Sequence, residues 1–271
     1  RQPGQSAKET IESGTKAAAA GGFTRVATMP NTKPVIDSAI IVDGLKYKIA
    51  AEGVVKVDII GSLSKGLEGK ELSSMGGMAK AGVVAFSDDG RYVQNCDFMR
   101  KAMEYAGMFG KIVIDHCEDA DLIEGGHMHE GVVSHELGLK GRPAVAEDIA
   151  VARDILLAEA TGTAVHIAHI STKNAVQMVR QAKAKGLKVT AEATPQHMIL
   201  TDEALRSYDP RFKVNPPLRS EEHRKAVVEG LVDGTIDAIV TDHAPHTIEE
   251  KDCEFSLAPS GFVGLETSLG T

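Results

Sequence analysis

The stretch PAVAEDIAVARDILLAEATGTAVHIAHIS, residues 143–171, shows the pattern that decides the fold. Its first part, Pro143–Ala160, begins with a proline, which is favoured in the first turn of a helix. Apolar residues then repeat at helical spacing: Ile149, Ala152, Ile155, Leu156 and Ala160. The segment that follows, Thr163–Ile170, is short and almost wholly apolar, as a strand covered by helices on both faces is. The stretch therefore predicts a helix followed by a buried strand.

The same alternation extends along the whole chain. Six more short runs are rich in β-branched residues and are mostly separated by helical stretches: Thr24–Met29, Val55–Ser62, Val83–Ser87, Lys111–His116, Lys188–Ala193 and Ile236–Thr241. Seven strands that alternate with helices predict an α/β fold, a TIM-like (β/α)8 barrel that lacks one strand. The length of 271 residues suits such a barrel, and no low-complexity linker divides it, so we expect one domain over residues 1–271.

A doubly wound open sheet would show the same alternation, and the polar residues distinguish the two folds. A dinucleotide-binding sheet carries a glycine-rich turn after its first strand, whereas this chain has Pro30-Asn31-Thr32 there. In a barrel, functional side chains gather at the carboxyl ends of many strands. Nearly every predicted strand here ends in residues that can bind metal or donate hydrogen bonds, which favours the barrel.

Composition excludes several classes of function. The net charge is -8, with 42% hydrophobic and 25% charged residues, which argues against a nucleic-acid or anionic-membrane partner. No apolar run approaches the roughly 18 residues that a membrane-spanning helix needs. The three cysteines predict neither a disulfide framework nor a zinc knuckle. Without a secretory signal in the sequence, we expect a cytoplasmic enzyme with a small-molecule substrate.

Four strand ends carry candidate metal ligands. Asp88 and Asp89 follow one strand, and His116, His169 and Asp242 end three others. Carboxylate oxygen and imidazole nitrogen suit zinc and related divalent ions. A single buried histidine is more often a core residue, and Asp-Asp-Gly is more often a turn, but four strand ends together predict a metal site. Spacing alone does not separate Asp88 from Asp89.

Other histidines are interpreted differently. His127, His129 and His135 lie in the glycine-rich stretch Gly125–Gly141, which we expect to be an exposed loop. We leave them out of the metal site. We expect Cys117, which is next to His116, to be buried and neutral, because no second histidine is assigned to activate it.

Five ordered motifs resemble the bacterial single-function dihydroorotases of the amidohydrolase superfamily. They are Met29-Pro30-Asn31-Thr32-Lys33-Pro34, Phe86-Ser87-Asp88-Asp89-Gly90, Asp115-His116-Cys117-Glu118, Asn215-Pro216-Pro217-Leu218-Arg219 and Thr241-Asp242-His243-Ala244-Pro245-His246. The resemblance runs from Arg1 to Thr271 and implies reversible, metal-dependent hydrolysis of L-dihydroorotate to N-carbamoyl-L-aspartate, a step of pyrimidine biosynthesis.

The resemblance also implies a ligand set. Asp89 would bridge two metal ions, most simply zinc, with His116 and His169 on one ion and Asp242 on the other. The family carries His-x-His-x-Arg on its first strand, so we expect Arg1 to be that arginine and the two histidines to precede it. The first strand, a flanking β-sandwich and a C-terminal segment would then lie outside this chain, whose last residues from Gly264 we expect to open a helix.

Roles in catalysis follow from the same resemblance. Asp242 would be the catalytic proton shuttle, moving a proton from the attacking water to the departing ring nitrogen. Arg1, Asn31 and His246 would bind the substrate carboxylate, and Asn215 would lie along the ring. Asn31 and Asn215 also have simpler interpretations as turn and extended residues. The family often has a second histidine where Gln196 stands, and we assign no catalytic role to His197.

Two alternatives remain open. An allantoinase or hydantoinase would open a similar ring, but hydantoinases and many allantoinases carry a carboxylated lysine where Asp89 stands. A noncatalytic dihydroorotase-like barrel could instead serve as a partner of aspartate carbamoyltransferase, and the retained ligands argue against this. We expect a homodimer, with association with aspartate carbamoyltransferase as a further possibility.

Overall fold

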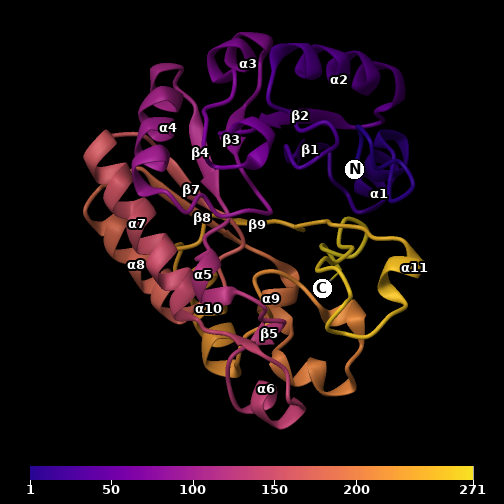
Figure 1. The fold of residues 1–271 in the computed structure, drawn as a ribbon, viewed down its shortest axis with the longest axis vertical. Helices are drawn as coiled ribbons and strands as arrows, with labels where there is room; N and C mark the ends of the chain where they lie inside the picture. The colour runs from indigo at the N-terminus through magenta and orange to yellow at the C-terminus, as the bar shows by residue number, and fades with distance from the viewer. Residues whose placement is uncertain (271) are drawn as a thin grey trace. The chain divides into compact units, whose positions relative to one another are not determined.

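The computed structural model describes residues 1–270 and confirms the predicted alternation of strands and helices. One parallel sheet has seven strands within the described part of the chain, in the order β1-β2-β3-β4-β7-β8-β9 (Figure 1). Each overlaps one predicted strand: β1 (Arg25–Thr28), β2 (Lys56–Gly61), β3 (Ala85–Ser87), β4 (Ile112–Asp115), β7 (Val165–Ile167), β8 (Val189–Ala193) and β9 (Ala238–Ile239). The predicted strands are longer, by two or more residues at some ends, than the strands observed.

Helices separate the strands. The α-helices are α1 (Ile11–Ala20), α2 (Ala39–Glu52), α3 (Met75–Ala81), α4 (Cys96–Met108), α5 (Ala120–Ile123), α6 (Val132–Leu137), α7 (Val145–Thr161), α8 (Lys173–Ala184), α9 (Pro195–Ile199), α10 (Glu221–Val232) and α11 (Ile248–Lys251). Three short 3-10 helices are η1 (Lys65–Leu67), η2 (Asp202–Ser207) and η3 (Pro210–Phe212). Among the described residues, no helix combines the length and apolar character needed to cross a membrane.

The chain forms two compact units. The first comprises Arg1–His116, Leu156–His166 and Leu265–Gly270. The second comprises Cys117–Ile155 and Ile167–Gly264. The residues from Leu265 to Gly270 form successive turns. The prediction of a helix from Gly264 onward was therefore wrong for the described residues.

The first unit packs helices against β1, β2 and β3. Its core contains several buried methionines and Phe86: the largest fully buried side chains include Met75, Met78, Met99 and Met103. Gly61 ends β2, where an added Cβ would lie 2.9 Å from Met78 Sδ and 3.3 Å from Phe86 Cδ1. Glycine at this position therefore lets α3 and β3 pack closely beside the strand.

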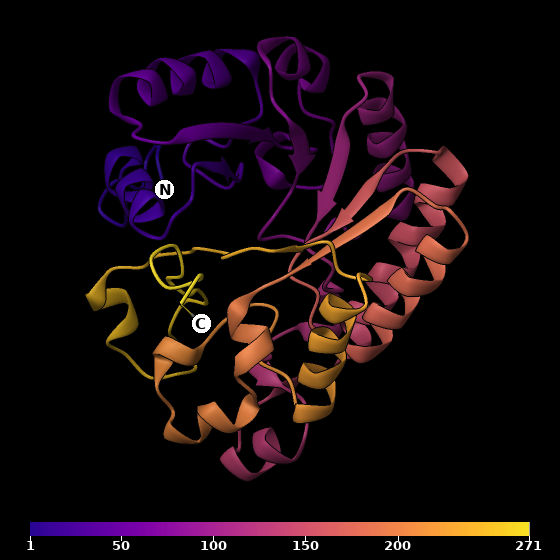
Figure 2. The ribbon, with the colours of Figure 1, turned by 180° about the vertical axis from the view of Figure 1, so that it is seen from behind.

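The second unit packs α10 alongside α8 (Figure 2), and both helices carry buried residues. An added Cβ on Gly230 of α10 would lie 2.8 Å from Val176 Cγ1 of α8. On the other side of α8, the chain returns as β8, which pairs with β9 through Glu192 and Ala238. The close contact between α8 and α10 thus fixes the two helices that lead into β8 and β9.

Helix α7 confirms the helix predicted at Pro143–Ala160, but its buried face differs from the apolar repeat in the sequence. Ile149 is 48% exposed and Leu156 is 63% exposed. Apart from Val151, the buried positions are alanine or acidic residues: Ala146, Glu147, Ala150, Asp154 and Ala158. Small side chains allow the helix to lie close to the sheet, and the buried acids take part in hydrogen bonds described below.

The stretch Gly125–Gly141 is not the exposed loop that its glycines predicted. Strand β5 (Met128–His129) pairs in parallel with β6 (Gly141–Arg142), and α6 lies between them in the sequence. Met128 and Val133 join Leu205 and Phe255 in a small buried core. His129 is itself buried, whereas His135 is exposed. The expectation was wrong because apolar residues spaced between the glycines provide a core for this segment.

Candidate functional site

The two aspartates after β3 have different surroundings. Asp88 is 1% exposed, and one of its oxygens accepts hydrogen bonds from the backbone N–H groups of Leu63 and Ser64, at 2.8 and 3.0 Å. Its other oxygen accepts a hydrogen bond from the Ser64 hydroxyl. Burial raises the pKa of Asp88, while these hydrogen bonds act in the opposite direction. Asp88 therefore holds the loop after β2, and Asp89 is the better candidate ligand.

Asp89 lies beside His116 within the first unit. His116 directly follows β4, and its Nδ1 is 4.0 Å from Asp89 Oδ1. Both residues are buried: Asp89 is 9% exposed and His116 is 4% exposed. The distance is too long for a direct hydrogen bond, and it exceeds by about half an ångström the spacing of two donors that bind one tetrahedral ion at about 2 Å. A small side-chain movement would bring this carboxylate and imidazole onto one divalent metal.

Asn31 contacts the same aspartate. Its Nδ2 donates toward the backbone carbonyl and Oδ2 of Asp89, at 3.3 and 3.4 Å. The turn that carries Asn31 is fixed by the N-terminal segment, because the Gln5 side chain donates to the Asn31 carbonyl at 3.2 Å. The Gln5 backbone N–H also donates to the Arg1 carbonyl at 3.1 Å. The structure thus brings the segments of Arg1, Asn31 and Asp89 together in the first unit.

His169 and Asp242 follow β7 and β9 and belong to the second unit. His169 is 5% exposed, and Asp242 is partly buried. Both have left-handed backbone conformations, with φ of 34° and 45°. Such conformations are costly for residues other than glycine and are concentrated at functional sites. The backbone conformations of His169 and Asp242 thus favour a functional role for both predicted ligands.

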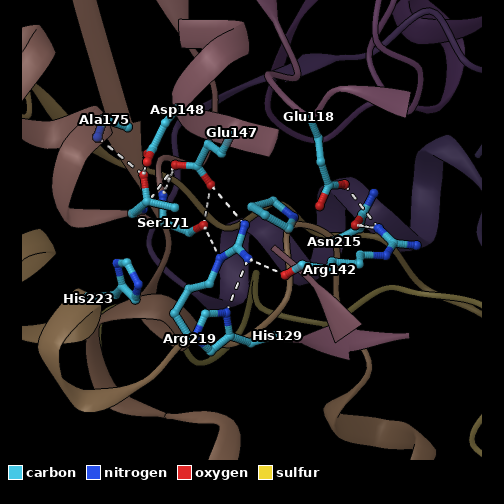
Figure 3. A network of polar contacts seen from close by, with 12 residues as sticks. Glu118, His129, Arg142, Glu147, Asp148, Ser171, Ala175, Asn215, Arg219 and His223 are labelled. Atoms are coloured by element: carbon cyan, nitrogen blue, oxygen red, sulfur yellow. Dashed lines mark hydrogen bonds and ion pairs between the residues drawn. The ribbon is translucent and has the colours of Figure 1, made fainter. Parts of the chain in front are cut away.

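The loop after His169 is held by a buried charged network (Figure 3). Glu147 of α7 accepts hydrogen bonds from the backbone N–H groups of Ser171 and Thr172, at 2.7 and 2.9 Å, and from the Ser171 hydroxyl. Arg219 donates to Ser171 Oγ at 3.0 Å and lies 3.4 Å from Glu147. Because Glu147 and Arg219 are each 2% exposed, this pair rigidly connects α7 to the loop.

His129 contacts the same arginine. Its Nδ1 accepts a hydrogen bond from Arg219 Nη1 at 3.4 Å. Burial, and then the charge of Arg219, lower the pKa of His129 to about 3. The ring is therefore neutral, and its Nδ1 is engaged by Arg219, which supports leaving His129 out of the predicted metal set.

Asn215 lies in a second network of the same unit. Arg142 donates from Nη1 to Asn215 Oδ1 and to Glu118 Oε2, the latter at 3.0 Å (Figure 3). Sequence reasoning missed Arg142, Glu147 and Arg219. The available signals were the acidic residues of the α7 helix and the arginine at the end of the Asn215–Arg219 motif, and neither identifies its partner.

His246 has oxygen acceptors at both ring nitrogens. Nε2 is 2.9 Å from the Ser260 carbonyl oxygen, and Nδ1 is 3.2 Å from Glu250 Oε2. A carbonyl oxygen only accepts, so Nε2 carries a hydrogen and donates. Glu250 belongs to α11, which begins one residue after Thr247. The ring is thus oriented by the segment that follows β9.

His197 and Cys117 are structural residues in the second unit. His197 Nε2 donates to the Pro216 carbonyl at 2.9 Å, and Nδ1 is 2.7 Å from the Thr194 hydroxyl. Burial lowers the pKa of His197 to about 3, so the ring is neutral. Cys117 is 4% exposed, and its Sγ lies 3.3 Å from Asp154 Oδ2. The predicted burial of Cys117 is confirmed.

Comparisons with known proteins agree with this arrangement. Residues 1–175 match the family described as Dihydro-orotase-like. Dihydroorotase of Pelotomaculum thermopropionicum is 59% identical over 270 residues, which cover 100% of this chain and 63% of that protein. Dihydroorotase of Geobacter metallireducens is 56% identical over 269 residues, covering 99% of this chain and 63% of that protein. The chain thus spans less than two thirds of these relatives.

Solved structures show the same fold. L-hydantoinase (dihydropyrimidinase) from Arthrobacter aurescens superimposes with a TM-score of 0.83 at 24% identity, over 96% of this chain and 60% of that one. Dihydroorotase from Saccharomyces cerevisiae in complex with 5-fluoroorotic acid gives a TM-score of 0.72 at 18% identity, over 94% and 71% of the two chains. The TIM-like α/β barrel class predicted from the sequence is confirmed. The family match covers more than half of this chain, which therefore belongs to the dihydro-orotase-like family.

Proposed function

We propose that the full-length protein is a dihydroorotase, a cyclic amide hydrolase that interconverts L-dihydroorotate and N-carbamoyl-L-aspartate. The observation that carries the proposal is the buried Asp89–His116 pair, whose ligand atoms are 4.0 Å apart after two adjacent strands. Relatives that are named Dihydroorotase at 52–59% identity support the same activity. Residues 1–271 would then form part of one amidohydrolase barrel.

The proposed metal ligands are Asp89, His116, His169 and Asp242. Each follows a different strand of one parallel sheet, and the carboxyl ends of such strands form the functional edge of a barrel. The donors are carboxylate and imidazole groups without thiolate, which suits zinc, and two ions are proposed. When bound, the ions would activate water and polarise the amide carbonyl.

The remaining chemistry belongs to residues of this chain. Asp242 is proposed to take a proton from the attacking water on its carboxylate and to deliver it to the departing ring nitrogen. Arg1 would bind the substrate carboxylate as a planar cation, with Asn31 and His246 beside it. Asn215 would hold the ring. The contact between Asn31 and Asp89 supports this placement of the carboxylate close to the metal ligands.

The alternative hydantoinase or allantoinase activity is weaker on two grounds. Aspartate, not lysine, stands at position 89 after β3. The hydantoinase from Arthrobacter aurescens is only 24% identical to this chain, so its similarity supports the fold and not the activity. A noncatalytic partner of aspartate carbamoyltransferase has no need for four retained ligands. Assembly as a homodimer, association with that enzyme and a cytoplasmic location remain proposals. Three free cysteines fit a reducing compartment.

The test compares substrates in the full-length protein. We expect ring opening of L-dihydroorotate and little or no opening of allantoin or hydantoin. The Asp242→Asn variant should lose turnover by at least about a thousandfold while remaining folded, because the amide cannot carry the proton. Asp209→Asn is the matched control, since Asp209 pairs with exposed Arg211 two residues away. Opening of allantoin but not of dihydroorotate would refute the assignment, and an active Asp242→Asn enzyme would remove the proton-shuttle role.

A further inference from the structure

Arg142 connects three segments of the second unit (Figure 3). This arginine ends β6, and its side chain is 17% exposed. Nη1 donates both to Glu118 Oε2, at 3.0 Å, and to Asn215 Oδ1. Nε donates to the Gly126 carbonyl at 2.8 Å. One planar guanidinium thus holds the loop after β4 and the segment before Pro216 in a fixed arrangement.

This contact decides the orientation of the Asn215 amide. Oxygen and nitrogen of an asparagine side chain are normally assigned from their partners. A guanidinium carries five N–H donors and no acceptor, so the amide atom that faces Arg142 must be the oxygen. The amide nitrogen, with its two N–H donors, is consequently directed away from Arg142. An asparagine without this partner could present either group to a ligand.

The guanidinium is itself firmly held. Glu118 is 1% exposed, so its carboxylate requires a partner, and Arg142 is always charged. The backbone carbonyl of Arg142 accepts a hydrogen bond from Arg219 Nη1 at 3.2 Å. Arg219 is fixed in turn by Ser171 and Glu147. Both the main chain and the side chain of Arg142 are therefore fixed, and the Asn215 amide has little freedom to flip.

We infer that Arg142 is a positioning residue, which fixes Asn215 as a hydrogen-bond donor toward a ring carbonyl oxygen of the cyclic amide substrate. The inference rests on the proposed function, in which Asn215 binds the ring. The Asn215 amide nitrogen would then donate to a ring carbonyl oxygen, which can only accept.

Two variants of the full-length enzyme separate the donor role from a general structural role. Asn215→Asp keeps the shape and the oxygen that pairs with Arg142, but it removes the amide donors. We expect KM for L-dihydroorotate to rise about tenfold or more, because one hydrogen bond is lost and an acceptor faces an acceptor. We expect kcat to change by less than about threefold, since the interaction is the same in ground and transition states.

Arg142→Lys keeps a cation beside Glu118 but cannot donate in one plane to both Glu118 and Asn215. It should raise KM by about tenfold in the wild-type background. In the Asn215→Ala background it should raise KM no further, because it acts through Asn215. Arg211→Lys, at an arginine that is 83% exposed, is the matched control and should leave KM and kcat unchanged.

Wild-type turnover is measured first, so that the two claims fail separately. If the wild type does not open dihydroorotate, the proposed function fails and this inference fails with it. If the wild type is active but Asn215→Asp has an unchanged KM, only the inference is overturned. The same holds if Arg142→Lys raises KM further in the Asn215→Ala background. Should Arg142→Lys not fold, the KM of Asn215→Asp decides alone.

Discussion

Asp88 and Asp89 are adjacent in the sequence, but their carboxylates have different partners. Asp88 accepts three hydrogen bonds from Leu63 and Ser64, whereas Asp89 lies beside His116 and Asn31. The sequence could predict an acidic strand end, and the family motif favoured Asp89. It could not separate the two by physical reasoning, because the partners of Asp88 lie about two dozen residues earlier in the chain.

Replacing Asp88 with alanine should therefore mainly affect stability, whereas replacing Asp89 should mainly affect metal binding. Asp88→Ala should lower the free energy of unfolding by on the order of 3 kcal/mol, because three buried donors lose their acceptor. Asp89→Ala should lower it by about 1 kcal/mol or less in metal-free protein, yet it should reduce bound metal. Urea unfolding and metal analysis of the full-length protein measure both. Metal loss confined to Asp88→Ala would reverse the assignment.

His197 should make stability depend on pH. Its pKa is about 3 in the folded protein because of burial, below its ordinary 6.5. As the pH falls, the unfolded chain therefore binds a proton before the folded protein does. The stability of the folded protein is unaffected by the protonation of His197 above pH 6.5 and falls progressively between pH 6.5 and pH 3. The slope is about 1.4 kcal/mol per pH unit. His197→Gln should flatten this decline in urea unfolding measured from pH 7 to pH 4, and an unchanged slope would contradict the neutral ring.

At the scale of elements, the strands were predictable and the helix faces were not. Buried parallel strands are apolar along their length, so all seven could be found from the sequence. In α7, however, Ile149 and Leu156 are exposed while Glu147 and Asp154 are buried. Hydrogen bonds from Ser171 and Thr172 to Glu147 account for its burial, and such long-range partners leave no periodic signal.

Two helical glycines provide a matched test of packing. An added Cβ on Gly44 of α2 meets nothing within 4 Å, whereas on Gly230 of α10 it lies 2.8 Å from Val176. Gly44→Ala should therefore raise the free energy of unfolding by about 0.5–1 kcal/mol, through helix propensity alone. Gly230→Ala should lower it by about 1–3 kcal/mol through overpacking between α8 and α10. Equal effects in urea unfolding would show that the α8–α10 contact is loose.

At the scale of the whole molecule, the barrel class followed from the order of strands and helices together with polar strand ends. The predicted ligands follow strands β3, β4, β7 and β9, which span most of the sheet order. The networks of Arg142 and Arg219 could not be predicted, because each arginine contacts a side chain more than 70 residues away in the sequence. Sequence pattern thus identified the proposed chemistry, while the positioning of its loops required the structure.

The most direct test of the account is the rate at which the full-length protein opens L-dihydroorotate before and after its metal is removed with a chelator. Carboxylate and imidazole ligands predict a fall of at least about a hundredfold, with recovery when Zn²⁺ is returned. A metal-depleted protein that still opens the ring at the original rate would contradict the proposed metal-dependent hydrolase.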